Sequence, residues 1–217
     1  MSSLIKVRIL SWNDIYNYVD ILASKIVCSN WHPDIIIAIA RGGLVPAVLL
    51  SDFLGVKSML AIQLEHWPAP GQVEESVRLR HDLPPVDISG KRVLIVDDIA
   101  DTGDTLLFAK KYVGSRYTGV SIKTAALHVR KNKTRFVPDY WSEEVESEHW
   151  IMYPWNYVED LTLIMKRVVN SLKDVNNLVS VLERLQRETG IDLSRIPVVC
   201  MKNVLRELGR EPRSSIC

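Results

Sequence analysis

A dense group of acidic and hydroxyl residues follows a short apolar run, Val93–Val96, in the middle of the chain. Its polar members are Asp97, Asp98, Asp101, Thr102, Asp104 and Thr105. Carboxylates accept hydrogen bonds from the hydroxyls of a sugar, whereas backbone N–H groups at the start of a helix donate to a phosphate. The pattern therefore predicts a site for a ligand that has both a polyhydroxyl ring and a phosphate.

Residues within this acidic turn are suited to different roles. The segment 102–105 offers backbone donors and two hydroxyls to a phosphate, and Gly103 lets the backbone approach closely. Asp97 and Asp98 are adjacent, so in an extended segment they point to opposite faces and need not do the same work. A solvent-exposed turn with a capping threonine is the alternative, but it would not require so many acids.

A second turn, Arg41-Gly42-Gly43, follows the apolar run Ile35–Ala40. A guanidinium next to bare glycine backbone suits an anion. Taken alone, these residues are equally compatible with a glycine turn that carries a surface arginine. The acidic turn elsewhere in the chain favours the anion site.

Both turns must be positioned by the elements around them. Branched apolar runs predict buried strands over 35–40, 58–64, 93–96 and 121–128, and the spacing of apolar residues predicts helices over 11–26, 44–54 and 105–113. The alternation predicts an α/β fold, a doubly wound and mostly parallel sheet with helices on both faces. Ligands bind such sheets at the carboxyl ends of strands, where both turns lie.

Two stretches depart from this alternation. Residues 65–90 contain four prolines and many charges, which predicts a long irregular loop, either at the active site or disordered. From about Val158 the apolar spacing is helical. We therefore expect a domain over 1–160 and a helical C-terminal extension over 161–217, which serves oligomerisation or shields the site.

Bulk composition narrows the class of protein. The 217 residues carry a net charge of +1, so no global field attracts nucleic acid and any anion site must be local. The three cysteines, Cys28, Cys200 and Cys217, are far apart, which argues against a zinc site or disulfide framework. No apolar run approaches a signal peptide or the roughly 20 residues of a membrane span. These features predict a cytoplasmic protein with no membrane partner.

The acidic turn resembles a known sequence motif. Residues 93–105, Val-Leu-Ile-Val-Asp-Asp-Ile-Ala-Asp-Thr-Gly-Asp-Thr, are similar to the phosphoribosyl pyrophosphate (PRPP) signature of type I phosphoribosyltransferases, and the resemblance extends from about Ile35 to Trp155. It implies that Asp97 and Asp98 bind the ribose hydroxyls. The substrate-binding set is then Asp97, Asp98, Ala100, Asp101, Thr102, Gly103, Asp104 and Thr105, with the last four on the 5′-phosphate.

The same resemblance assigns a catalytic residue and a pyrophosphate site. Asp101 is implied to lie near the purine N7, as general base or charge stabiliser. Arg41 and Gly42 are implied to hold the pyrophosphate. The first peptide of that loop is often cis in the family, which we apply here to the Arg41–Gly42 bond.

Residues 150–155 resemble the stretch that covers the base in 6-oxopurine enzymes of this family. Trp150 would stack on the purine, the Ile151 backbone would contact the base edge, and Trp155 is better explained as a core residue. The 6-oxopurine enzymes of the family usually have a lysine near the exocyclic oxygen of the base. In this sequence the position of that lysine aligns with either Val137 or Arg130. Val137 offers no donor and favours adenine, whereas Arg130 would allow guanine or hypoxanthine; we give adenine a slight preference.

The implied reaction joins a purine to PRPP, giving a nucleoside monophosphate and pyrophosphate in purine salvage. Mg²⁺ would be held mostly through PRPP, with Asp97 as a candidate ligand, and no dedicated metal cage is expected. The expected partners are PRPP, a purine base and a second copy in a homodimer or higher oligomer, but no nucleic acid. Two alternatives are a non-enzymatic PRPP-sensing regulator and a pyrimidine or orotate phosphoribosyltransferase.

Overall fold

The computed structural model describes residues 6–68, 75–146, 149–170 and 178–209. The chain divides into two compact units: a sheet unit, Asn13–Ser147, and a helical unit that combines Met1–Trp12 with Glu148–Cys217. The division expected between residues 160 and 161 falls inside helix α4 (Tyr157–Asn170). The N-terminal residues therefore belong with the C-terminal ones.

The sheet unit is built on six strands in the order β4-β3-β2-β5-β6-β7. Every neighbouring pair is parallel except β3 with β4, which confirms the predicted α/β fold with a mostly parallel sheet. The strands are β2 (Ile35–Ala40), β3 (Met59–Pro68), β4 (Glu75–His81), β5 (Arg92–Ala100), β6 (Ser121–Val129) and β7 (Tyr140–Glu144).

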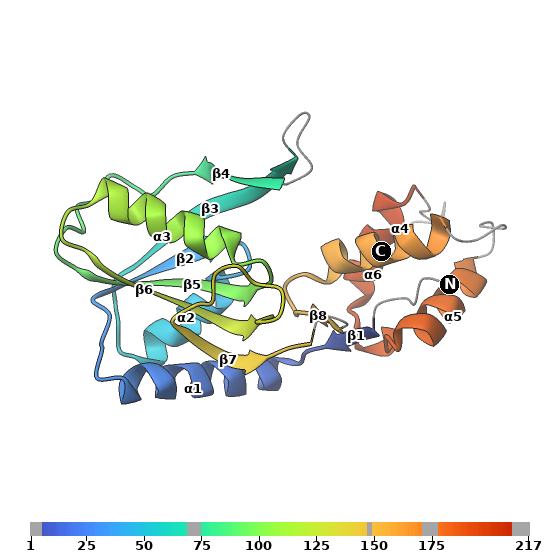
Figure 1. The fold of residues 1–217 in the computed structure, drawn as a ribbon. Helices are drawn as coiled ribbons and strands as arrows, with labels where there is room; N and C mark the ends of the chain where they lie inside the picture. Colours follow the sequence, from blue (N-terminus) through green and yellow to red (C-terminus); the bar gives the residue numbers. More distant parts are fainter. Residues whose placement is uncertain (1–5, 69–74, 147–148, 171–177, 210–217) are drawn as a thin grey trace. The chain divides into compact units, whose positions relative to one another are not determined.

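Helices cover both faces of this sheet (Figure 1): α1 (Trp12–Cys28) and α2 (Leu44–Phe53) lie on one face and α3 (Asp104–Arg116) on the other. The residues expected to form the apolar stripe of α1 are buried, as their helical spacing requires. On the opposite face α3 buries Leu106, Ala109 and Val113 in a core with the branched residues of β2 and β5. This packing fixes the start of α3 next to the end of β5.

Two stretches of the sheet unit differ from the sequence-based expectation. Strand β5 continues through Asp97 and Asp98 to Ala100, so both acids lie within the strand. The prediction of one irregular loop over 65–90 is wrong for residues 65–68 and 75–81, because β3 and β4 form an antiparallel hairpin, whereas residues 82–90 are irregular as predicted. Pro68 stands at the end of β3, and β4 contains no proline, so its N–H groups remain available for pairing. Residues 69–74 lie outside the described residues.

The helical unit has its own core. Strand β1 (Lys6–Ile9) pairs in parallel with β8 (His149–Met152), and helices α4, α5 (Leu178–Thr189) and α6 (Val198–Glu207) follow, with a short 3₁₀ helix, η1 (Leu193–Arg195), before α6. Apolar residues of β1, β8 and the three helices form one buried cluster. The expected C-terminal helices are confirmed, whereas the two-stranded sheet was not expected.

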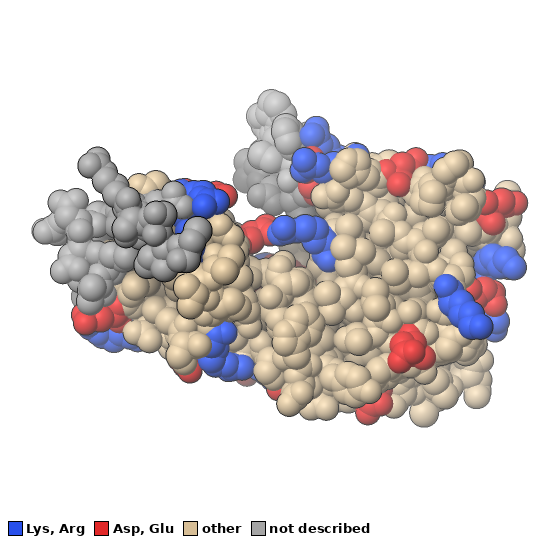
Figure 2. All heavy atoms as spheres, turned by 180° about the vertical axis from the view of Figure 1, so that it is seen from behind, with Lys and Arg blue, Asp and Glu red and all other residues tan. Residues whose placement is uncertain are grey.

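The visible surface carries a mixture of charges. Figure 2 shows acidic and basic side chains interspersed, and no area of the described residues on that face is covered by Lys and Arg alone. Among the described residues, no helix has the length and apolar character needed to cross a membrane.

Candidate active site

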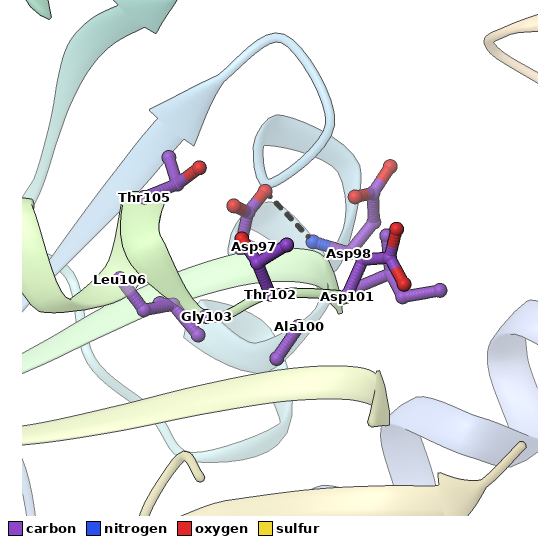
Figure 3. Close-up of a pocket in the computed structure, with 9 residues that line it drawn as sticks. Asp97, Asp98, Ala100, Asp101, Thr102, Gly103, Thr105 and Leu106 are labelled. Atoms are coloured by element: carbon purple, nitrogen blue, oxygen red, sulfur yellow. Dashed lines mark hydrogen bonds between the residues drawn. The ribbon is translucent and has the colours of Figure 1, made fainter. Parts of the chain in front are cut away.

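A cavity of about 220 Å³ lies where β5 ends and α3 begins (Figure 3). One continuous stretch lines it, namely Asp97, Asp98, Ile99, Ala100, Asp101, Thr102, Gly103, Thr105 and Leu106. The stretch contains every residue of the predicted ribose and 5′-phosphate set except Asp104, which is the first residue of α3. The local fold explains this, since a buried strand delivers the acids and the next helix presents its N–H groups.

The paired acids are buried at the base of this cavity. Asp97 is 9% and Asp98 6% exposed, and the Asp98 backbone N–H donates to Asp97 Oδ1 at 3.0 Å. Burial raises the pKa of the Asp97 carboxyl well above its usual range, and the negative charge of Asp98 raises it further. The pair is therefore suited to a ligand that donates hydrogen bonds or brings positive charge.

Gly103 caps α3 in the left-handed conformation, with φ of 81°. A Cβ on Gly103 would lie 2.3 Å from the Phe136 carbonyl oxygen and 2.5 Å from Thr134 Oγ1. The backbone N–H of Arg135 also donates to the Thr102 carbonyl at 2.8 Å. A loop after β6 therefore packs directly on the proposed phosphate turn, and only glycine fits between them.

The arginine turn meets the acidic turn. A Cβ on Gly42 would lie 2.4 Å from Asp98 Oδ2, and one on Gly43 would lie 2.2 Å from the Val96 carbonyl oxygen. The two turns, far apart in sequence, thus form one wall, as expected for adjacent parallel strands. The prediction of a cis Arg41–Gly42 bond is wrong by one residue: the cis bond is Ala40–Arg41, because the loop begins at the last residue of β2.

Asp101, the predicted catalytic residue, lies between two cations. Its Oδ1 is 3.0 Å from Arg130 Nε and its Oδ2 is 2.8 Å from Lys133 Nζ. Both cations come from the loop that follows β6. Lys133 was missed by sequence reasoning, although its place after the neighbouring strand, at the same edge of the sheet, was an available signal.

Of the two residues considered for contact with the base 6-position, Arg130 is next to Asp101. Arg130 is only 6% exposed; its backbone N–H donates to the Ala100 carbonyl at 3.1 Å and its Nη1 donates to the Glu146 carbonyl. Val137 is 44% exposed, and neither residue is among those that line the cavity. The geometry favours Arg130.

The predicted base-covering residues belong to the helical unit. Ile151 is buried in β8, and Trp150 packs partly against the core of that unit. The indole Nε1 of Trp150 is buried and has no hydrogen-bond partner among the described residues. Trp155 stacks on Tyr153 with ring centroids 4.9 Å apart, which agrees with a packing role. Stacking of Trp150 on a base stays a prediction.

The sequence is similar to those of known proteins. Residues 8–160 match the family model of the phosphoribosyl transferase domain. Xanthine phosphoribosyltransferase 1 of Saccharomyces cerevisiae is 27% identical over 199 residues, which cover 72% of this chain and 94% of the yeast protein.

Solved structures from several organisms resemble this one. A purine phosphoribosyltransferase from Pyrococcus horikoshii is 34% identical, with a TM-score of 0.59, and the match covers 69% of this chain and 93% of that one. A hypothetical protein from Neisseria gonorrhoeae, solved with bound ppGpp, is 25% identical, with a TM-score of 0.63. The match covers 86% of this chain and 97% of the Neisseria chain. That similarity extends beyond the sheet unit.

Proposed function

This chain belongs to the phosphoribosyltransferase family, on the branch that acts on purines, and we propose that its acceptor is a 6-oxopurine base. The reaction would transfer the 5-phosphoribosyl group of PRPP to the base and release pyrophosphate. The xanthine-specific name of the yeast relative supports an oxopurine. The slight preference for adenine in the sequence analysis is therefore replaced.

One observation carries the choice of base: Arg130 is buried beside Asp101, with Nε 3.0 Å from the carboxylate. A guanidinium has only donors, so a base edge next to it should present an acceptor. The 6-oxo group of hypoxanthine, guanine or xanthine is an acceptor, whereas the 6-amino group of adenine is a donor. A buried donor that faces another donor loses its hydrogen bond, so a site of this kind discriminates strongly between adenine and the 6-oxopurines.

The remaining roles follow from charge and position. The carboxylates of Asp97 and Asp98 would accept from the ribose hydroxyls, and their negative charge would stabilise the positive charge that builds on the ring as its bond to pyrophosphate breaks. The turn 102–105 would hold the 5′-phosphate, and Arg41 with Gly42 would bind the pyrophosphate. Asp101 would accept the proton of the purine imidazole ring.

Magnesium fits this donor set. Mg²⁺ prefers carboxylate and phosphate oxygens and keeps several waters, so one or two carboxylates beside PRPP suffice to hold it. Asp97 and Asp98 would supply those oxygens. The ion would neutralise charge on the leaving pyrophosphate.

Substitution of Arg130 tests the choice of base. Arg130→Gln should lower kcat/KM for hypoxanthine or guanine at least about tenfold, the loss expected when a charged donor is removed from a buried acceptor. Lys131→Gln is the matched control, because Lys131 pairs with Glu144 Oε2 at 2.9 Å and not with Asp101. Equal activity of the Arg130 variant, with unfolding temperature unchanged, would refute the assignment.

The ppGpp bound to the Neisseria protein supports a second ligand for the same pocket. That nucleotide combines guanine with two pyrophosphate groups, the same chemistry as the proposed base and pyrophosphate subsites. We expect ppGpp to inhibit this protein in competition with PRPP, measured as an apparent KM for PRPP that rises with ppGpp while kcat is constant. Inhibition that PRPP cannot overcome would place ppGpp elsewhere.

A further inference from the structure

The carboxylate of Asp101 lies between two cations, Arg130 and Lys133. Oδ1 is buried and is 3.0 Å from Arg130 Nε, without a hydrogen bond among the described residues. Oδ2 receives a hydrogen bond from Lys133 Nζ at 2.8 Å. The side chain as a whole is 44% exposed, so a ligand reaches the carboxylate from the side that Lys133 occupies.

The two cations differ in how firmly they are held. The Arg130 side chain is 8% exposed, and its backbone and guanidinium are both tied to neighbouring carbonyls. The Lys133 side chain is 52% exposed, and an ammonium on a four-carbon chain loses little when it returns to water. Of the two ion pairs of Asp101, the pair with Lys133 is therefore the easier one to break.

A purine that donates its imidazole N–H to Asp101 competes with Lys133 for the carboxylate. If the N–H meets Oδ2, it approaches the oxygen that already accepts from Lys133. If it meets Oδ1, the carboxylate must first turn, which also separates Oδ2 from Lys133. Resting on the proposed function, we propose that Lys133 is a displaceable positioning residue, which pairs with Asp101 in the empty site and is released when the base binds.

The surroundings give this pairing a physical purpose. Asp97, Asp98, Asp101 and Asp104 lie within one short stretch, and their negative charges repel one another when no ligand is bound. Lys133 compensates part of that charge in the empty site. The purine N–H takes the place of Lys133 as a donor to Asp101 when the base binds, so Lys133 contributes to the stability of the empty protein and opposes binding of the base.

This proposal makes a linked prediction for Lys133→Met. The variant should unfold at a lower temperature than wild type when empty, but at the same temperature when saturated with PRPP and 9-deazaguanine or 9-deazahypoxanthine, base analogues that keep the imidazole N–H and have carbon in place of the reacting nitrogen. The KM for the base should fall by up to about fivefold, the most that an exposed ion pair contributes. Lys133→Arg, which keeps a cation, should behave like wild type.

The experiment measures unfolding temperatures with and without PRPP and 9-deazaguanine or 9-deazahypoxanthine, and the KM for guanine or hypoxanthine. Lys131→Met is the matched control, because its lysine is 41% exposed and pairs with Glu144. Lys131→Met should change the unfolding temperature of the empty protein and of the saturated protein by the same amount.

Two results would overturn the proposal. An equal loss of stability in empty and saturated Lys133→Met would make Lys133 purely structural, and a rise in the KM for the base would mean that it contacts the base. Failure of the wild type to form any purine nucleotide would refute the proposed function and this inference with it. Failure of the Lys133 prediction in an active enzyme leaves the function intact.

Discussion

Asp97 is a buried acid whose burial raises its pKa and whose neighbour Asp98 raises it further. The folded protein then holds the Asp97 proton more tightly than the unfolded chain does. This contribution favours the folded state below the ordinary Asp pKa of 3.8 and is lost as the pH rises through the folded-state pKa. The buried Asp97 carboxylate therefore lowers the free energy of unfolding at neutral pH, although it supplies a binding group for the ligand.

Asp97→Asn removes this penalty. We expect the variant to be more stable than wild type at pH 7, by about 1–3 kcal/mol, and to lose that advantage below about pH 4. The KM for PRPP should rise at least about tenfold, because an amide is a weaker acceptor for the ribose hydroxyls. Urea unfolding at several pH values measures the first effect, and a stability difference that does not change with pH would contradict it.

The two glycines of the arginine turn give a matched pair of predictions. Gly43→Ala should lower the free energy of unfolding by about 3 kcal/mol, because its Cβ would meet the Val96 and Ile39 carbonyl oxygens at 2.2 and 2.8 Å. Gly42→Ala should leave the protein folded, since the three atoms nearest its Cβ all belong to the end of the Asp98 side chain, but should displace that carboxylate and weaken PRPP binding. Thermal unfolding and PRPP titration separate the two outcomes. The account fails if Gly43→Ala is as stable as Gly42→Ala.

At this scale the sequence predicted the pocket residues well. The strand, the acids, the threonines and the glycine follow one another within residues 93–105 of the sequence. Residues this close along the chain necessarily share one strand-to-helix turn. The contacts of Asp101 with Arg130 and Lys133 were not predicted, because they join residues about thirty positions apart through a loop whose course the sequence does not specify.

At the scale of elements, β2 and β5 are joined at their amino ends by Asp34 and Arg92. Asp34 accepts hydrogen bonds from Arg92 Nη2 at 2.7 Å, Nε at 3.1 Å and the backbone N–H at 2.8 Å. The hydrogen bonds from the Arg92 side chain lower the pKa of Asp34 to about 2. The contact helps to align the two strands whose other ends form the site.

Asp34→Asn should therefore reduce stability by about 1 kcal/mol at neutral pH, a value already reduced for solvent screening. Because the folded-state pKa of Asp34 is depressed, its contribution is present above the ordinary value of 3.8 and is lost as the pH falls toward about 2. Thermal unfolding of both proteins across that range, at low salt, measures the difference. A difference that grows at acid pH would refute this assignment.

The strands and helices near the site were predicted because their apolar residues follow clear periods. The hairpin of β3 and β4 was not, since prolines and charges near its ends suggested a loop. Pairing across the hairpin is supported by Glu65, which lies 3.2 Å from Arg78 Nε and 2.8 Å from Arg80 Nη1. These cross-strand contacts depend on register, which composition does not reveal.

At the scale of the whole molecule, the chain forms two units with separate cores. The sequence predicted the C-terminal helices but not that β1 would pair with β8, because short strands far apart in sequence carry no local sign of their partner. Leu185 is fully buried in the core of the helical unit. Leu185→Ala should cost 2–5 kcal/mol there.

Because the two cores are separate, hydrogen exchange should become faster in α4, α5 and α6 of Leu185→Ala and stay unchanged in β2, β5 and β6. Val113→Ala, buried in the core of the sheet unit, is the converse control. Faster exchange in both units for either variant would show that they unfold as one.

The central claim, transfer of phosphoribose to a 6-oxopurine, has one direct test. The wild-type protein would be mixed with PRPP, Mg²⁺ and equal concentrations of adenine, hypoxanthine, guanine and xanthine, and the nucleotides formed would be quantified by mass spectrometry, with Asp101→Asn alongside. We predict that inosine, guanosine or xanthosine monophosphate forms, that adenosine monophosphate does not, and that the variant is much slower. Adenosine monophosphate as the main product, or no purine nucleotide at all, would contradict the account.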